Sequence, residues 1–304
     1  MTFEGTKEWE AALARVILEA RRAASIFQPL SVSMPQTLDE SRIDCAESLD
    51  WMDRLPASSA GGIVSDPPYS SGGAFRADRC NSNATAKYIN KEQQANYAED
   101  FAGDSRDQRA WAVWVELVLR KALRVVEPGG VCAISVDWRQ LATLTDAMQV
   151  AGWILRGIVP WDKTQACRPV LGRFRAQCEY WVWGSNGRLG LDRNAPVLPG
   201  CLRFPVSRDK THPTQKPVEM LRMVSRIVER GRPIIDPFSG SGAHGVAAVL
   251  EGHPFLGCEM VPHYAESGSR WLAETIEHAS NNPPLFDDLN DSGSEQMGLG
   301  TDEE

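Results

Sequence analysis

Residues 62–69 read Gly-Ile-Val-Ser-Asp-Pro-Pro-Tyr, a short apolar run that stops at an acid and two prolines. Such a run predicts a buried strand that ends abruptly. Asp66 would then stand at the carboxyl end of the strand, where open α/β sheets bind their ligands. The prolines cannot extend a sheet ladder, so they predict a stiff lip that projects Tyr69. A carboxylate, a rigid carbonyl and an aromatic ring would lie close together, which suits a planar base with an exocyclic amine.

The composition is ordinary for a soluble globular protein. The chain has 304 residues, of which 42% are hydrophobic and 24% charged, enough for one large domain or two small ones. No apolar run reaches the roughly 18 residues of a membrane span, and no signal-peptide pattern opens the chain. The seven cysteines form no Cys-x-x-Cys pair, so neither a zinc site nor a disulfide framework is favoured. We therefore expect a protein of the reducing cytoplasm, with no metal and no membrane partner.

The charges are segregated along the chain. Although the formal net charge is −8, residues 156–210 hold ten Lys or Arg against four Asp or Glu. Residues 282–304 hold seven acids and no Lys or Arg. The basic stretch can contact phosphates despite the net charge, and the acidic tail is predicted to be disordered.

One domain of residues 31–281 is expected between two terminal segments. Apolar residues at helical spacing predict an amphipathic helix within 1–30, packed on the domain rather than binding a partner. Inside the domain, residues 70–107 are polar and irregular, which predicts a mobile insertion. Residues 187–209 also show little periodicity.

Strands and helices alternate through the domain, which predicts an α/β fold. The predicted strands are 43–45, 62–65, 131–136, 153–161, 179–183, 232–236 and 255–259. The predicted helices are 46–55, 108–126, 138–150, 217–228, 243–251 and 262–278, the fourth with Pro217 in its first turn.

A glycine-rich loop follows one of the later strands. Gly240, Gly242 and Gly245 satisfy G-x-G-x-x-G, and Glu259 ends the next strand. Glycines let a ligand approach the backbone, and such an acid accepts from ribose hydroxyls. An NAD-dependent oxidoreductase is therefore one interpretation, although it would not need the Asp-Pro-Pro-Tyr sequence.

Three motifs together resemble the amino-methyltransferases that use S-adenosylmethionine (AdoMet) to methylate adenine N6 or cytosine N4 in DNA. They are Asp-Pro-Pro-Tyr at 66–69, Thr-His-Pro-Thr-Gln-Lys-Pro at 211–217 and Asp-Pro-Phe-Ser-Gly-Ser-Gly at 236–242. With the tetrapeptide first and the glycine loop last, their order resembles the β class, a circular permutation of the usual arrangement. The resemblance implies a Rossmann-like fold with a mixed, mostly parallel seven-stranded sheet and helices on both faces.

The resemblance also implies roles for single residues. Asp66, Pro67, Pro68 and Tyr69 would act on a base flipped out of the duplex, and Asp rather than Ser at position 66 favours adenine N6. Binding of AdoMet is implied for Asp44, Lys216, Asp236, Phe238, Gly240, Gly242 and Glu259. From the residues alone, Asp44 is almost equally well explained as a helix N-cap. The chain departs from the family at Ala243-His244-Gly245, and the role of His244 stays open.

DNA is the implied partner. Contacts are assigned to arginines of the basic stretch, namely Arg168, Arg173, Arg175, Arg188, Arg193 and Arg203. Residues 187–209 stand where the family has its target-recognition segment, and their small number predicts a short target of about two to four bases. A silent nucleic-acid-binding module is disfavoured because every reactive position is present. The resemblance implies a bacterial or phage-encoded enzyme of the kind found in restriction–modification systems, and it leaves a homodimer open.

Overall fold

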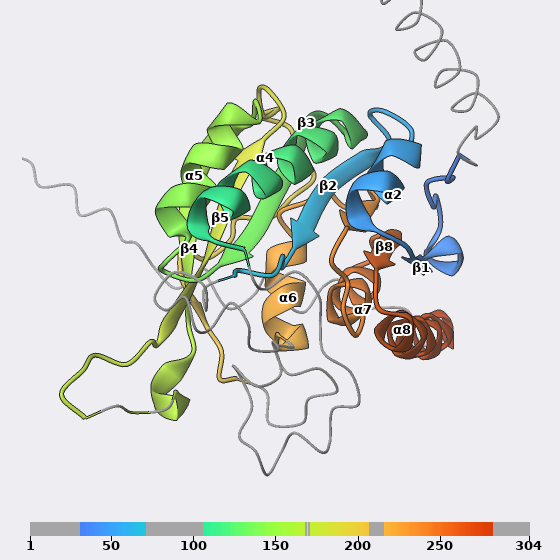
Figure 1. The fold of residues 1–304 in the computed structure, drawn as a ribbon. Coiled ribbons are helices and arrows are strands. Elements are labelled where there is room, and N and C mark those ends of the chain that lie inside the picture. Colours follow the sequence, from blue (N-terminus) through green and yellow to red (C-terminus); the bar gives the residue numbers. More distant parts are fainter. Residues whose placement is uncertain (1–30, 71–105, 168, 170, 207–215, 282–304) are drawn as a thin grey trace, which may run out of the picture.

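An eight-stranded sheet forms the centre of the molecule (Figure 1). The computed structural model describes residues 31–70 and 106–281, apart from 168, 170 and 207–215. The strand order is β1-β8-β7-β2-β3-β5-β4-β6. The strands are β1 Arg42–Cys45, β2 Ala60–Ser65, β3 Val126–Val136, β4 Ile154–Asp162, β5 Cys178–Ser185, β6 Leu202–Arg203, β7 Ile234–Asp236 and β8 Phe255–Glu259.

The sheet is mixed and mostly parallel, as expected. Only β5 runs antiparallel to its two neighbours, β3 and β4. The expected number of seven strands is wrong by one, because β6 adds a parallel pair of residues beside the end of β4. A two-residue strand carries no periodicity, so the sequence within 187–209 could not reveal it.

Helices cover both faces of the sheet, as expected. They are α2 Ser48–Arg54, α4 Gln108–Val125, α5 Leu141–Val150, α6 Val218–Ser225, α7 Ala243–Leu250 and α8 Pro262–Asn281, with short 3₁₀ turns η1 Leu38–Glu40 and η4 Thr164–Ala166. One hydrophobic core lies under α2, α4 and α5, and a second lies under α6, α7 and α8. All six residues of β2 are buried, which explains why this strand is a continuous apolar run rather than an alternating one.

Several element boundaries differ from the expected ones. The helix predicted from residue 138 begins at Leu141, because the Asp137 carboxylate first accepts the backbone N–H groups of Arg139 and Gln140 in a turn. The strand predicted from 131 begins at Val126, and its pairing with β2 is irregular there. Pro217 is the N-cap of α6 rather than part of its first turn.

The strand directions place many chain segments at one edge of the sheet. The parallel strands β1, β8, β7, β2 and β3 end at this edge, β4 also ends there, and β5 begins there. We call it the carboxyl edge, and the opposite one the amino edge. Residues 1–30, 71–105 and 282–304, with the expected helix, insertion and tail, lie outside the described residues.

Candidate active site

The Asp-Pro-Pro-Tyr lip leaves the carboxyl end of β2 and is held from both sides. Trp111 of α4 donates its indole N–H to the Pro68 carbonyl at 2.8 Å. Gln140, which precedes α5, donates to the Tyr69 carbonyl at 3.1 Å. The Tyr69 hydroxyl shares a 2.6 Å hydrogen bond with Ser135 of β3. The rigidity expected from the prolines is therefore reinforced by side chains from three other elements.

Beside the lip lies a network of four charged side chains, of which Lys216 is buried and the other three are partly buried. Lys216 Nζ donates to Asp66 Oδ2 at 2.6 Å and to the Tyr69 hydroxyl at 3.0 Å. The same Nζ lies 3.2 Å from Glu179 Oε2. Glu179 also accepts from Lys163 Nζ at 3.0 Å and from the Tyr69 hydroxyl at 3.2 Å. We call Asp66, Lys216, Glu179 and Lys163 the charge network.

Burial and charge fix the protonation states in this network. Burial raises the pKa of Tyr69 well above its usual value, and the carboxylates of Asp66 and Glu179 raise it further. Burial alone would raise the pKa of Glu179, but the ammonium groups of Lys216 and Lys163 outweigh it and bring that pKa to about 2. Burial alone would lower the pKa of Lys216, yet the two carboxylates raise it. At neutral pH, Tyr69 is therefore a neutral phenol, Glu179 is an anion and Lys216 is a cation.

Two acceptors at the lip remain without a donor among the described residues. One is the buried Oδ1 of Asp66. The other is the Pro67 carbonyl, whereas the next two carbonyls along the chain are bound as described above. A buried acceptor without a partner is costly and is seldom retained without a reason. The described residues therefore leave the hydrogen-bonding capacity of both oxygens unused.

The glycine loop between β7 and α7 contains two residues in the left-handed region, for different reasons. Gly242 has φ +88°, and a Cβ there would lie 3.0 Å from the Cα and carbonyl oxygen of Gly268 in α8. Gly240 has φ +52°, and its Cβ would meet nothing within 4 Å. Packing against α8 thus requires Gly242, whereas the side-chain position of Gly240 faces open space.

Asp236 and His244 lie inside the fold beneath this loop. Asp236 is fully buried, and its Oδ1 accepts from the Ser65 hydroxyl and, at 2.9 Å, from the Phe238 N–H. His244 Nδ1 lies 3.2 Å from Asp236 Oδ2. Burial raises the pKa of Asp236, against the opposing effect of His244. Asp236 therefore joins the loop to the end of β2, and His244 lies against its second oxygen.

The other cofactor candidates lie at neighbouring strand ends. Glu259, at the end of β8, accepts the Gly240 N–H at 3.0 Å, and the Phe238 ring lies 5.2 Å from that of Trp114. Asp44, in β1, accepts the Trp51 indole N–H at 2.9 Å. The N-cap of α2 is Glu47, so the N-cap interpretation of Asp44 is wrong.

Lys216 departs from this cofactor group. It is the sixth residue of the 211–217 motif, of which 211–215 lie outside the described residues. Its ammonium group binds Asp66 and Tyr69 of the lip, which places Lys216 with the candidate catalytic residues.

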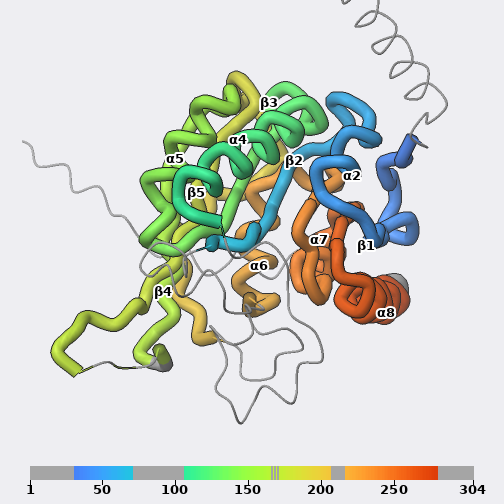
Figure 2. Tube along the Cα trace, viewed as in Figure 1, coloured from blue at the N-terminus to red at the C-terminus, as the bar shows by residue number. Residues whose placement is uncertain are grey.

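The structure divides the candidate DNA-binding arginines between the two edges. Arg173 is exposed in the hairpin loop between β4 and β5, which extends beyond the carboxyl edge (Figure 1 and Figure 2). Arg175 in the same loop donates to the carbonyls of Gln165 and Cys167, and it therefore also holds the loop's shape. Arg203, at the end of β6, has a side chain that is 77% exposed.

The remaining arginines lie elsewhere. Residues 186–188 follow the end of β5 at the amino edge, where Asn186 pairs with the backbone of Gly129. Arg188 is exposed there. Arg193 donates to the Ile227 carbonyl at 2.7 Å and so anchors its loop to the segment after α6. Arg168 lies outside the described residues.

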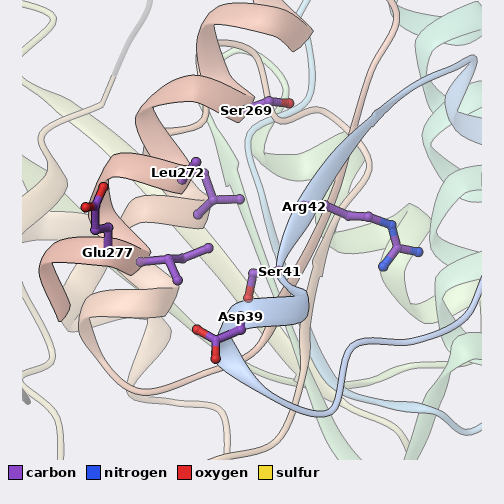
Figure 3. Close-up of a pocket in the computed structure, with 8 residues that line it drawn as sticks. Asp39, Ser41, Arg42, Ser269, Leu272 and Glu277 are labelled. Carbon is purple, nitrogen blue, oxygen red and sulfur yellow. The ribbon is translucent and has the colours of Figure 1, made fainter. Parts of the chain in front are cut away.

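A separate hollow lies at the β1 end of the sheet (Figure 3). Its volume is about 360 Å³, and it is lined by residues of η1, β1 and α8, namely Asp39, Ser41, Arg42, Ser269, Leu272, Ala273, Ile276 and Glu277. None of the candidate site residues lines it. Within the described part of the chain, no group of three or more His, Cys, Asp or Glu side chains could hold a metal ion. In the same part, no helix is long and apolar enough to cross a membrane.

Sequence reasoning missed Glu179, Lys163 and Ser135. Each lies close to the end of its strand that meets the carboxyl edge. For Glu179 the sequence offers one signal, an acid at the start of an apolar strand. That signal points to the site only once β5 is known to run antiparallel to β3.

A family model described as DNA methylase matches residues 61–198 and 201–270. These ranges make up more than half of the chain and include both the lip and the glycine loop. The chain belongs to the DNA methylase family. Among relatives, YubD of Escherichia coli (strain K12), a candidate methylase by its name, is 25% identical over 249 residues. That alignment covers 82% of this chain and 96% of YubD.

Solved structures share the fold. The complex of M1.HpyAVI with SAM superposes with a TM-score of 0.55 at 19% identity, covering 76% of this chain and 98% of that one. The PvuII DNA methyltransferase, which is cytosine-N4-specific, superposes with a TM-score of 0.57 at 13% identity, covering 82% and 97%. At these identities the likeness concerns the fold alone.

Proposed function

We propose that this DNA methylase transfers a methyl group from AdoMet to the N6 amine of adenine in DNA, after the base has left the duplex. The observation that carries the proposal is a pair of acceptors that lack a donor among the described residues, Asp66 Oδ1 and the Pro67 carbonyl, at the carboxyl end of β2. An exocyclic amine has two N–H groups, one for each acceptor.

These acceptors would prepare a weak nucleophile. The lone pair of the amine is delocalised into the π system of the ring, and two directed hydrogen bonds from its N–H groups would pyramidalise the nitrogen and localise that pair for attack. AdoMet supplies an electrophilic methyl group on a sulfonium sulfur, which leaves as a neutral thioether. The nitrogen gains the methyl carbon and then loses one proton, which Asp66 would accept. Asp66 positions the amine and need not be a strong base beforehand.

Tyr69 would hold the flipped base by stacking, which contributes about 1–3 kcal/mol per base. Its hydroxyl is bound to Ser135 and Glu179. A hydroxyl fixed in this way limits the swing of the whole side chain, so the ring is placed before the base arrives.

The glycine loop fits AdoMet. Gly240 offers open space and a backbone that a ligand can approach closely. Phe238 offers an apolar ring, and the Glu259 carboxylate, although bound to two backbone N–H groups, retains lone pairs for ribose hydroxyls. The fold neighbour M1.HpyAVI was crystallised with SAM, which supports the same assignment. Asp236, Gly242 and His244 would shape this site rather than touch the cofactor.

The choice of adenine rests on Asp66, because the resemblance associates Asp at this position with adenine N6. A cytosine-N4 enzyme is the alternative, because the cytosine-N4-specific PvuII enzyme has the same fold and the fold does not distinguish the two bases. Both bases carry an exocyclic amine, and the two acceptors described above suit either of them.

Nucleoside analysis tests the proposal. The purified protein is incubated with methyl-labelled AdoMet and double-stranded DNA, and the DNA is then digested to nucleosides and separated. We expect label in N6-methyladenine. Label in N4-methylcytosine would replace adenine by cytosine, and label in neither base would overturn the proposal.

A further inference from the structure

Glu179 stands at the centre of the charge network. Its Oε1 binds Lys163, and its Oε2 faces both Lys216 and the Tyr69 hydroxyl. The side chain is 19% exposed. Among the described residues no hydrogen bond joins Glu179 to Asp66, but the two partners of its Oε2 lead to the lip: Lys216 binds Asp66, and the Tyr69 hydroxyl belongs to the lip itself.

Lys216 links Glu179 to Asp66, because its ammonium group contacts both carboxylates. Only 5% of the Lys216 side chain is exposed, and an ammonium group buried to this degree requires compensating negative charge. Two carboxylates share it, at 2.6 Å for Asp66 and 3.2 Å for Glu179. Because Lys216 occupies Oδ2 of Asp66, the carboxylate cannot turn freely, and Oδ1 is the oxygen left for an amine.

The four charges alternate in sign along the network and sum to zero. Without the charge of Glu179, two ammonium groups would remain with one carboxylate. Lys216 would then either bind Asp66 alone or lose its proton, and in both cases the orientation of Asp66 would change. We infer that Glu179 is a positioning residue for methyl transfer, which fixes Lys216 and, through it, the Asp66 carboxylate. The inference rests on the proposed function.

A purely structural role for Glu179 makes a different prediction. Lys163 follows the end of β4, and its ion pair with Glu179 ties β4 to β5. If that tie were the whole role, loss of either partner would have the same effect. If Glu179 positions Lys216, the two substitutions should shift the pKa of Lys216 in opposite directions. Loss of Glu179 should lower that pKa, because Glu179 attracts the proton, and loss of Lys163 should raise it, because Lys163 repels the proton.

The experiment compares Glu179→Gln with Lys163→Met across the pH range, with turnover and AdoMet affinity measured for each. Among the described residues, the groups that face Lys216 are Asp66, Tyr69 and Glu179 directly, Lys163 through Glu179, and the uncharged ring of Trp161. For Glu179→Gln we expect kcat to fall about tenfold or more, with AdoMet affinity changed less than about twofold. The pH above which the variant loses activity, its alkaline limit, should fall by about one unit, because Lys216 then loses its proton more readily. For Lys163→Met the alkaline limit should move up.

Two further variants serve as controls. Glu179→Asp retains the charge and should retain the alkaline limit. Glu251→Gln removes another largely buried carboxylate with two cationic partners, Arg222 and Arg226, and should leave the pH profile unchanged. An unchanged kcat and alkaline limit in Glu179→Gln, or equal shifts in Glu179→Gln and Lys163→Met, would overturn the inference.

A readout without turnover separates this inference from the proposed function. Lysine labelled with ¹³C at Cε reports the ionisation of Lys216 by NMR, with the Lys216→Met spectrum giving the assignment. We expect Lys216 to titrate at lower pH in Glu179→Gln than in the wild type. A wild type that methylates no DNA would overturn the proposed function, whereas an unchanged titration of Lys216 would overturn the link to Glu179.

Discussion

The two oxygens of Asp66 differ in their surroundings. Oδ2 is bound to Lys216, whereas Oδ1 is buried and has no donor within the described residues. Asp66→Ala removes both oxygens and should abolish detectable methyl transfer. AdoMet affinity should stay within a few-fold, because Asp66 lies at the lip and not at the glycine loop. Labelled methyl transfer and calorimetry on one preparation check both expectations.

Asp162→Asn is the matched control for this variant. Asp162 also lies at the carboxyl edge, where it accepts from Thr164 and Gln177 of the hairpin, and its loss should leave turnover within a few-fold. Robust turnover by Asp66→Ala would refute the catalytic assignment.

Ionised Glu179 should stabilise the fold in a pH-dependent way. The pKa of Glu179 in the folded protein is about 2, below the usual value of 4.5. The stabilisation from its ionised form is therefore complete above pH 4.5 and is lost as the pH falls towards 2. The difference corresponds to roughly 3 kcal/mol. Thermal unfolding of the wild type and Glu179→Gln should show a larger gap in Tm at pH 7 than at pH 3. A gap that is constant with pH would mean that Glu179 is not ionised in the folded protein.

The sequence predicts those site residues that are contiguous in the chain. Asp66 to Tyr69 form a single motif, and a strand that ends in two prolines places them at an edge without further information. Glu179 and Lys163 lie far from that motif in sequence. They join it only because β5 runs antiparallel to both of its neighbours, and this direction is not encoded in either strand.

Gly242 and Gly240 of the glycine loop have different roles: the first is needed for packing against α8, and the second faces the space proposed for the cofactor. Gly242→Ala adds a strained backbone and a clash with α8, and should lower the free energy of unfolding by about 2–4 kcal/mol. Gly240→Ala adds strain alone and should cost about 1–2 kcal/mol. Its new methyl group would enter the open space assigned to AdoMet, so AdoMet affinity should fall by about tenfold. Denaturant unfolding measures the loss of stability and calorimetry measures AdoMet affinity. Equal changes of both quantities in Gly242→Ala and Gly240→Ala would contradict these roles.

The hairpin between β4 and β5 should contribute more to DNA binding than the first part of 187–209. Arg173→Ala should weaken DNA binding and reduce the slope of log K against log[salt] by about 1, since one phosphate contact is lost. Arg193→Ala should lower stability and leave that slope unchanged, because Arg193 binds the Ile227 carbonyl. Salt titrations of both variants with one duplex check the comparison. Equal salt slopes for the two variants would show that the hairpin arginine contributes no more to DNA binding than Arg193.

Elements with a regular pattern could be predicted, and those set by tertiary contacts could not. The strand 255–259 and the helix 108–126 match β8 and α4 within one residue. By contrast, the path of 187–206 depends on contacts with the ends of other elements. It leaves the amino edge beside Gly129 and returns to the carboxyl edge only at β6. A stretch without periodicity carries no signal for such a path.

At the scale of the molecule, the carboxyl edge gathers the candidate site from distant parts of the chain. The lip follows β2, the glycine loop follows β7, and Glu179 and Lys163 come from β5 and the end of β4. In a parallel α/β sheet the order of segments along the chain can change while the edge stays the same. This explains how a permuted motif order is compatible with a common site.

In the proposed function, Asp66 directs methyl transfer to adenine N6 in DNA. Sequencing that detects modified bases, on DNA from cells that express the wild type or Asp66→Ala, tests it most directly. We expect N6-methyladenine at a short or degenerate target of about two to four bases with the wild type, and none with the variant. Modified cytosine in place of adenine, or the same modification with Asp66→Ala, would contradict the account.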